Sequence, residues 1–334
     1  MSGRRTNLAL LALLVMALVT GALAFATGTG WARWPVISHS AVGLAIVILT
    51  PWKTMIARRG YRHRADGRFA SIALSVSVVL AVVSGIVFAI AGRVDLGPFD
   101  MMQIHIGSAF VAAPYAIWHV IARPVLPRRT DLDRRNLLRV GGLAAGAGLA
   151  YLSVEGTSRL FSLPGSRRRF TGSHEEGSFD PTAMPVTQWL NDTVPSIEPS
   201  SWRLAIKANG AETTMDLADL VGSSDQMEAT LDCTGGWYAT QRWEGVRLDR
   251  LLGDAAGSSI RVKSATGYGR RFPLDDAENL LLATRVGGEP LSPGHGFPAR
   301  LVAPGRRGFW WVKWVTEIEV SDRPWWTDWP FPVT

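Results

Sequence analysis

The only cysteine of this chain, Cys233, lies in a segment whose residue types suit chemistry. It follows a short, largely apolar run that begins at Ala229, and the pair Gly235 and Gly236 comes shortly after it. This pattern predicts a strand that ends, a sharp backbone turn and a sulfur atom placed at the turn. A lone thiol can pack in a core, act as a nucleophile or ligate a metal, and here it has no partner in the chain for a disulfide. The surrounding residues leave these three roles open.

Three histidines lie inside apolar stretches of the N-terminal half, where ionisable groups are functional candidates. His39 and His105 each lie near the start of a segment, at similar expected depth, so the two imidazoles predict a shared haem b iron. His119 follows His105 by 14 residues, which places both on one helix face, about 21 Å apart. A second haem at His119 would need His63 as its partner. For each histidine alone, a hydrogen bond between helices is the alternative.

Long uncharged segments dominate the first 155 residues and must position these histidines. Each is close to the ~20 residues that cross the hydrocarbon layer of a bilayer, although the last is shorter and rich in Gly and Ala. The alternative is a set of buried helices in a soluble protein. We expect an all-α transmembrane bundle in residues 1–155, with five helices at 7–26, 36–52, 69–91, 103–122 and 137–154.

The net charge of +7 is concentrated in loops. Basic residues cluster in 1–7, 53–68 and 123–139, which the five segments place on one side of a membrane. This distribution argues against a nucleic-acid partner. By the positive-inside rule these loops face the cytoplasm, so the C-terminal half emerges outside it, from a multi-pass protein of the cell membrane.

The entry to the fifth segment holds the pair Arg134-Arg135 before a weakly hydrophobic run. It resembles a twin-arginine export signal placed internally, and that pathway moves folded proteins. The alternative is that these arginines only anchor the helix at the membrane surface.

The C-terminal half has the composition of a soluble domain. Residues 156–169 are expected to be a linker, because 162–169 is rich in Pro, Gly and Arg. Residues 170–334 contain short alternating segments and few helical patterns, which predicts an α+β domain. Its expected elements are strands at 202–207, 226–232, 260–264 and 309–320, a short helix at 217–220 and a helix entry at 243–252.

A second chemical stretch lies about sixty residues beyond Cys233. It holds His-Gly-Phe-Pro-Ala-Arg at 295–300 and Val-Lys-Trp at 312–314. Together with the cysteine, these boxes resemble the sulfite oxidase family of molybdenum enzymes, which includes periplasmic methionine sulfoxide reductases. The resemblance covers roughly residues 169–323 and implies a molybdopterin-binding domain of the sulfite oxidase type.

The resemblance implies a role for several residues. Cys233 would ligate the molybdenum of a molybdopterin cofactor, and Arg300 and Lys313 would hold the phosphate of the pterin. The remaining cofactor contacts that it implies are His295, backbone groups of Trp311 and Val312, and, from a loosely matching stretch, Ser173 and His174.

The expected function is therefore that of a membrane-anchored molybdopterin oxidoreductase that transfers oxygen atoms outside the cytoplasm. Electrons would pass through haem in the bundle, exchanged with a quinol or another membrane donor. The substrate would be a small oxo-donor or sulfur compound. Trp237 and Tyr238 favour a sulfoxide, and Thr234–Trp237 replaces the Asn and Arg residues usual after the cysteine of sulfite oxidases.

Two alternatives remain open. One is a sulfite-type oxidase, whose anion pocket would draw on Arg242, Arg270, Arg271, Arg306 and Arg307. The other is a non-catalytic membrane receptor that keeps the fold without the metal.

Overall fold

The computed structural model describes residues 3–61, 68–128, 131, 133–188, 192–223, 225–329 and 331. The chain forms two compact units. We call Met1–Phe25 with Gly30–His174 the helical unit, and Ala26–Thr29 with Glu175–Thr334 the sheet unit.

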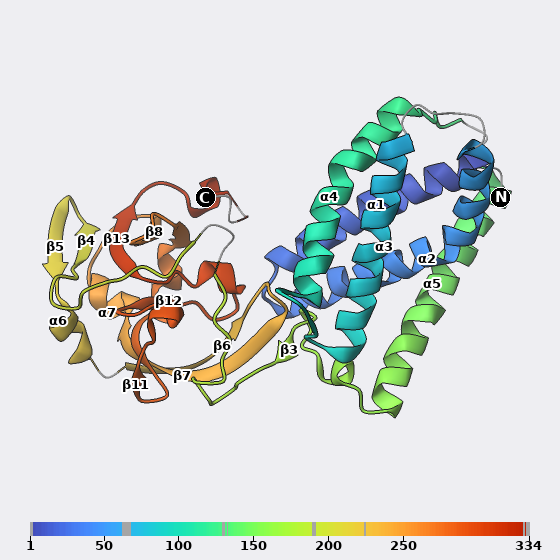
Figure 1. Ribbon diagram of the computed structural model, residues 1–334. Coiled ribbons are helices and arrows are strands. Elements are labelled where there is room, and N and C mark those ends of the chain that lie inside the picture. Colours follow the sequence, from blue (N-terminus) through green and yellow to red (C-terminus); the bar gives the residue numbers. More distant parts are fainter. Residues whose placement is uncertain are drawn as a thin grey trace. The chain divides into compact units, whose positions relative to one another are not determined.

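The helical unit is built from five long helices, each long and apolar enough to cross a membrane by length and composition. In Figure 1, α3 and α4 lie side by side, and α2 runs beside α5. The expected segments fall inside these helices, which are α1 (Gly3–Ala26), α2 (Arg33–Tyr61), α3 (Arg68–Ala91), α4 (Met101–Ala122) and α5 (Arg134–Leu160).

Local capping explains where two of these helices begin. Asp100 precedes α4 and accepts a hydrogen bond from the Gln103 backbone, while the Gln103 side chain accepts one from the backbone of Asp100. Asp133 caps α5 by accepting from the Asn136 N–H. These side chains satisfy backbone donors that have no partner within the first helical turn. A two-stranded hairpin, β1 (Asp95–Leu96) and β2 (Phe99–Asp100), precedes α4.

The segment expected to be a linker is ordered and packed. α5 continues to Leu160, and a 3₁₀ turn, η3 (Pro164–Arg167), follows it. A Cβ on Gly165 would lie 2.1 Å from the Ala89 carbonyl oxygen, so the turn is in close contact with α3. Arg168 forms an ion pair with Glu155 of α5. Proline and glycine here allow close packing, and this segment belongs to the helical unit.

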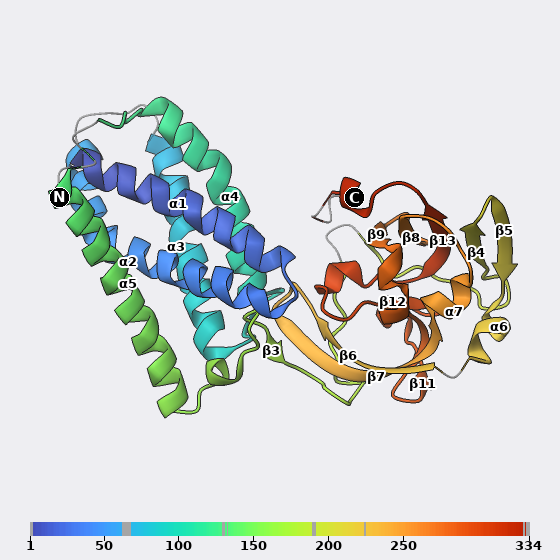
Figure 2. The same cartoon turned by 180° about the vertical axis from the view of Figure 1, so that it is seen from behind.

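The sheet unit contains a six-stranded and a five-stranded sheet. Figure 2 shows the long, curved strand β7 beside β6. The six-stranded sheet comprises β3 (His174–Glu175), β6 (Asp225–Asp232), β7 (Trp237–Arg247), β10 (Leu281–Val286), β11 (Glu289–Pro290) and β12 (Arg300–Val302). The five-stranded sheet comprises β4 (Leu204–Ala208), β5 (Ala211–Met215), β8 (Ser259–Ser264), β9 (Gly269–Pro273) and β13 (Val315–Ser321).

The five-stranded sheet has the order β5-β4-β13-β8-β9, in which β13 pairs with β4 in parallel and the other pairs are antiparallel. In the other sheet β7 pairs with β6 and β10, and β12 pairs with β10. Both sheets bury apolar side chains in one core, to which Trp243 and Leu282 contribute from one and Ile206 and Ile318 from the other. The domain is therefore a mixed α/β structure whose strands hold the loops described next.

Two local expectations were wrong. Residues 243–247, expected at a helix entry, continue strand β7, and only α7 (Leu248–Leu252) is helical. Cross-strand pairing with β6 and β10 overrides the local pattern. The final strand starts at Val315, because a 3₁₀ turn, η6 (Gly308–Trp310), precedes it. The expected helix at 217–220 is present as α6 (Leu217–Val221).

Candidate active site

Cys233 lies at the turn that joins β6 to β7, as the sequence predicts. β6 ends at Asp232, and Cys233 donates its backbone N–H to the Trp237 carbonyl at 2.9 Å. Gly236 donates back to the Cys233 carbonyl at 3.1 Å and has φ +88°, a conformation that favours glycine. The Cys233 Sγ accepts from the Gly235 N–H at 3.3 Å. The two glycines therefore fix the thiol at a strand end.

The thiol lies in a cleft that encloses about 740 Å³ of space, open solvent included. Both sheets and several loops contribute to the lining, which consists of Pro185, Thr187, Gln188, Asp192, Leu231, Cys233, Thr234, Trp237, Ser264, Tyr268, His295, Arg300, Gly308, Phe309, Trp311, Lys313 and Trp314.

Arg300 starts β12 and is 1 % exposed. Its guanidinium carbon lies 5.2 Å from the ring centroid of Trp243 and 5.7 Å from that of Trp311. One Nη donates to the His295 carbonyl at 3.0 Å, while Nε is buried with no hydrogen-bond partner in the structure. Burial lowers the pKa of Arg300 to about 9. A buried guanidinium with a free donor in a cleft indicates a site for an anionic ligand.

Lys313 is the second cation of the cleft. Its Nζ donates to the carbonyls of Gly294 at 2.7 Å and Thr187 at 2.9 Å, and to the Gln188 amide oxygen at 3.3 Å. Burial, and then the charge of Arg300, lower the pKa of Lys313 to about 7. Within the part of the chain that the structure describes, neither cation forms an ion pair with a carboxylate. The pair thus fits a phosphate group, which would restore full charge to both side chains.

Burial and the nearby positive charges also shift the pKa of the Cys233 thiol. Burial raises the pKa of Cys233, and the Gly235 N–H and the charges of Arg307 and Lys313 oppose that rise. A soft metal ion would hold this sulfur as a thiolate. The donor set of one thiol beside two phosphate-binding cations therefore fits a molybdopterin, with Cys233 on the metal and Arg300 and Lys313 on the phosphate.

His295 lines the cleft, but both its ring nitrogens bond to protein atoms. Nε2 lies 3.1 Å from the Met184 carbonyl and Nδ1 lies 2.9 Å from the Ser292 hydroxyl. Because a carbonyl can only accept, Nε2 carries the proton and Nδ1 accepts from Ser292. Burial, then the charges of Arg300 and Lys313, lower the pKa of His295 to about 4, so the ring is neutral. In this structure it fixes the loop that precedes Arg300.

Two other expected cofactor contacts use their backbone N–H groups locally. Trp311 lines the cleft, but its N–H donates to the Gly308 carbonyl at 3.0 Å, and the Val312 N–H donates to the Trp310 carbonyl at 3.2 Å. Val312 is buried and does not line the cleft.

Ser173 and His174 are likewise absent from the lining of the cleft. They belong to the helical unit, where His174 Nε2 donates to the Phe88 carbonyl of α3 at 3.0 Å. The His174 ring packs edge-on against the Phe88 ring, with centroids 4.9 Å apart.

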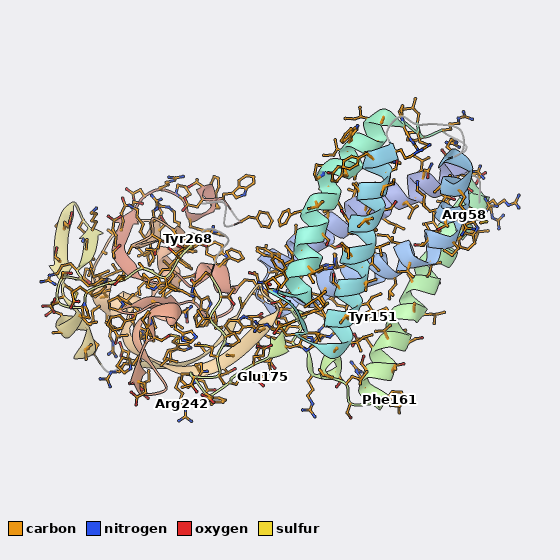
Figure 3. The ribbon with its side chains drawn as sticks, viewed as in Figure 1. Arg58, Tyr151, Phe161, Glu175, Arg242 and Tyr268 are labelled. Carbon is orange, nitrogen blue, oxygen red and sulfur yellow. The ribbon has the colours of Figure 1, made fainter. Side chains whose placement is uncertain are left out.

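Tyr268, labelled in Figure 3, lines the cleft and was not among the residues expected there. Its hydroxyl donates to the Phe309 carbonyl at 2.5 Å and accepts from Arg270 Nε at 2.7 Å. Burial raises the pKa of Tyr268, against the opposing charge of Arg270. The signal available in the sequence was an aromatic residue between two glycines, Gly267 and Gly269.

The five arginines considered for an anion pocket do not line this cleft. Arg242 is exposed at the surface of the domain (Figure 3). The other four are engaged by protein groups, which are Tyr268 and the Trp329 carbonyl for Arg270, Ser259 and Ser321 for Arg271, Asp276 for Arg306 and Asp232 for Arg307. Among the described residues, the cations at the cleft are therefore Arg300 and Lys313.

The helical unit brings His39 of α2 and His105 of α4 together. Their Nε2 atoms lie 3.4 Å apart. His39 Nδ1 is 3.0 Å from the Ala17 carbonyl and His105 Nδ1 is 2.7 Å from the Ala81 carbonyl. Because these carbonyls can only accept, each Nδ1 carries the proton and the two Nε2 lone pairs face each other. This arrangement suits a metal ion held by both imidazoles.

His119, the candidate ligand for a second haem, bonds differently. Its Nδ1 lies 3.0 Å from the Ser71 hydroxyl of α3. Its expected partner, His63, lies outside the described residues. Over the described part of the chain, no group of three or more His, Cys, Asp or Glu side chains is placed to hold a metal ion.

Comparison with known proteins agrees with the chemistry of the cleft. Residues 191–329 match the family described as "Oxidoreductase molybdopterin binding domain". The chain is 29 % identical over 175 residues to the mitochondrial sulfite oxidase of Rattus norvegicus, covering 41 % of this chain and 32 % of the relative. It is 28 % identical over 248 residues to inducible nitrate reductase [NADH] 2 of Glycine max, covering 58 % and 28 %.

Shorter and weaker similarities complete this comparison. A 77-residue stretch is 48 % identical to nitrate reductase [NADPH] of Mycosarcoma maydis, covering 23 % of this chain and 8 % of the relative. Among solved structures, sulfane dehydrogenase SoxCD from Paracoccus pantotrophus is similar, with 27 % identity and a TM-score of 0.37, over 39 % of this chain and 40 % of the other. The chain spans about a third or less of the length of the curated relatives named here.

The matched range contains Cys233, Arg300 and Lys313 of the cleft. Residues 191–329 are therefore an oxidoreductase molybdopterin-binding domain with sulfite oxidase and nitrate reductase homologues.

Proposed function

We propose that the protein is a membrane-anchored molybdopterin oxidoreductase that reduces a sulfoxide-type substrate outside the cytoplasm. The observation that carries the proposal is the cleft in which Cys233 faces two cations, Arg300 and Lys313, that have no carboxylate partner among the described residues. When bound, the molybdenum centre supplies oxygen-atom exchange coupled to two electrons.

The residues of the chain have separate tasks at this site. Cys233 binds the metal through Sγ. Arg300 offers a planar fork and Lys313 a point charge to the phosphate of the pterin. Tyr268 and Trp237 border the same cleft, and their rings exclude water from the space beside the thiol. His295 fixes the loop before Arg300 in one orientation.

The charges of the cleft favour a neutral substrate. An anion such as sulfite requires positive groups beyond those that hold the phosphate. Within the described lining, Arg300 and Lys313 are the cations and Asp192 adds a negative group. A sulfoxide carries no net charge and places an apolar group against Trp237 or Phe309. Its reduction uses two electrons and two protons, breaks the S–O bond and releases a thioether and water.

The histidine pair supports a haem b in the helical unit as the electron carrier. His39 and His105 direct unprotonated Nε2 atoms at one point, and the backbone carbonyls of Ala17 and Ala81 fix both tautomers. Such carbonyl partners are typical of metal-bound histidines. We expect a quinol to supply the electrons and both protons, because it releases two of each on oxidation. His119 stays a candidate for a second haem.

The membrane location of this pathway is part of the proposal. Five apolar helices and basic loops on alternate connections support five membrane crossings with the sheet unit outside the cytoplasm. The pair Arg134-Arg135 at the start of α5 supports export of the folded domain by the twin-arginine route. A C-terminal alkaline phosphatase fusion tests this topology, since activity is expected only when the fusion lies outside the cytoplasm.

The deciding experiment is a substrate screen on the purified full-length protein. Reduced viologen is supplied with sulfoxides and other oxo-donors, and sulfite oxidation is assayed in parallel with an artificial acceptor. We expect viologen oxidation with sulfoxides, one molybdenum per chain by metal analysis, and loss of both activity and molybdenum in Cys233→Ser. Turnover of sulfite alone supports the oxidase alternative. Protein that lacks molybdenum and activity supports the receptor alternative.

A further inference from the structure

Asp232 and Arg307 form a buried ion pair directly beside the metal-binding cysteine. Asp232 is 2 % exposed and Arg307 is 4 % exposed. Arg307 Nη1 donates to the Asp232 carboxylate, and its Nη2 donates to the Cys233 carbonyl at 3.1 Å. A bridge in parallel register also joins the backbones of Asp232 and Arg307. One guanidinium therefore holds both the residue before the cysteine and the cysteine itself.

The loop that carries Arg307 is packed tightly against this turn. A Cβ on Gly308 would lie 3.1 Å from the Cys233 Cα and 3.4 Å from the Asp232 carbonyl oxygen. Neither Asp232 nor Arg307 lines the cleft, and Arg307 is linked to the site by its hydrogen bond to the Cys233 carbonyl. This distinguishes Arg307 from Arg300, whose guanidinium faces the cleft and pairs with no described carboxylate.

We propose that Asp232 and Arg307 are positioning residues that hold Cys233 at the metal and keep the net charge behind the sulfur at zero. The proposal rests on the molybdenum function argued above. Its consequence is electrostatic: charges in a poorly solvated region interact strongly, and the net charge around a thiolate-bound metal sets its reduction potential. The carboxylate cancels the guanidinium charge, so the potential is lower than an unpaired arginine would make it.

The sign of the effect follows from charge alone. Asp232→Asn keeps a hydrogen-bond acceptor for Arg307 but leaves the positive charge uncancelled. Positive charge stabilises the reduced, more negative state of the centre, so the midpoint potential rises. Adding Arg307→Gln removes that positive charge as well and returns the potential toward the wild-type value. If the pair had a purely structural role, the double variant would show the larger change of midpoint potential, because it loses more contacts than the single variant.

The chain contains a matched control. Arg306, the neighbour of Arg307, forms an ion pair with Asp276 at 2.8 Å, and both side chains are about one-third exposed. Asp276→Asn also leaves an arginine, Arg306, without its carboxylate. Arg306 contacts solvent, which screens its charge. We expect no change of potential in this variant.

The experiment is a redox titration of the molybdenum EPR signal in the purified full-length protein, with molybdenum content measured for every variant. The inference is supported by an upward shift in Asp232→Asn, recovery in Asp232→Asn with Arg307→Gln, and no shift in Asp276→Asn. It is overturned by an unchanged potential in Asp232→Asn, or by a larger shift in the double variant.

Two further outcomes are also decisive. If Asp232→Asn purifies without molybdenum, retention of the metal in the double variant supports charge compensation, and loss in both overturns it. If the wild-type protein itself holds no molybdenum, the proposed function fails. If the wild-type protein holds molybdenum and only the variants give a contradicting result, the inference about the Asp232–Arg307 pair fails and the proposed function stands.

Discussion

In the helical unit, His39 and His105 direct two nitrogen lone pairs at one point, whereas in the sheet unit Arg300 and Lys313 direct two positive groups into one cleft. The first arrangement needs a positive centre between the imidazoles, and the second needs an anion beside the guanidinium. In the proposed function, the histidine pair binds a metal and the two cations bind the phosphate of a cofactor.

The two units also position their functional side chains in different ways. The two histidines lie on long helices, and each ring is oriented by a hydrogen bond to a main-chain carbonyl of a neighbouring helix. The cysteine and the cations lie on turns and strand ends that come together only when two sheets pack. We expect substitutions in the sheet unit to affect chemistry most, and substitutions in the helical unit to affect electron supply.

The largest expected effect is at the cysteine. Cys233→Ser replaces a soft thiolate with a hydroxyl that does not ligate molybdenum in the same way, so viologen-dependent turnover falls by on the order of 10³-fold, about 4 kcal/mol in the activation barrier. Steady-state assays with reduced viologen measure this loss. Haem bands, which depend on the other unit, stay unchanged, and their disappearance would contradict the separation of the two sites.

The next effect concerns the histidine pair. His105→Ala and His39→Ala each remove one axial ligand, and we expect the reduced haem b bands in the optical spectrum to be lost. Viologen-dependent turnover persists because it bypasses the haem, while quinol-dependent turnover stops. Unaltered haem bands in both variants would rule out these ligands.

A glycine substitution sharpens the same test without removing a ligand. A Cβ on Gly85 would lie 2.8 Å from His105 Nδ1, so Gly85→Ala displaces the ring from the Ala81 carbonyl. We expect weaker haem binding and a shifted haem potential. Gly107→Ala, on the helix that carries His105, is the control, because a Cβ there meets no atom within 4 Å.

A smaller effect is expected from Arg300→Lys, which keeps the charge but removes the planar fork. Retention of molybdopterin on dialysis is expected to fall by about 10- to 100-fold, because a charge-assisted hydrogen bond to the phosphate, worth roughly 1.5–3 kcal/mol, is lost. Cofactor content per chain, measured by fluorescence of the oxidised pterin, reports the change. Arg242→Lys, at the exposed surface, is the control and retains the cofactor.

The smallest effect is a pH dependence in protein prepared without cofactor. The folded pKa of Lys313 is about 7, against an ordinary value of 10.5, so the unfolded chain binds more protons between these values. The unfolding free energy attributable to this lysine therefore rises as pH increases through that window. Thermal melts are expected to show the rise in wild type and not in Lys313→Met. Lys207→Met, which removes an exposed lysine paired with Glu317, should leave the rise in place.

Local pattern was sufficient for much of the architecture. The apolar segments lie within five long helices, and Cys233 lies at the turn between two strands as the flanking residues indicate. Helices and tight turns are governed by neighbours in sequence, so they leave a readable signal. The close packing of Gly165 on Ala89, within the segment expected to be a linker, left no such signal because it depends on a residue distant in the sequence.

Some site residues could not be found in this way. Tyr268 reaches the cleft because β8 and β9 place their connecting loop beside Phe309, forty-one residues further along the chain. His174 was expected near the pterin, and its hydrogen bond to the Phe88 carbonyl could not be anticipated from its neighbours in the sequence.

The order of the residues sets which atoms are available: one thiol, a His-Gly-x-Pro-x-Arg box with a following lysine, and histidines inside apolar segments. Which charges cancel one another depends on how the chain packs. Arg307 meets Asp232 seventy-five residues away, while Arg300 meets no carboxylate among the described residues. The reason is physical: side-chain type is local, but burial and electrostatic pairing depend on distances that exist only after the chain has packed.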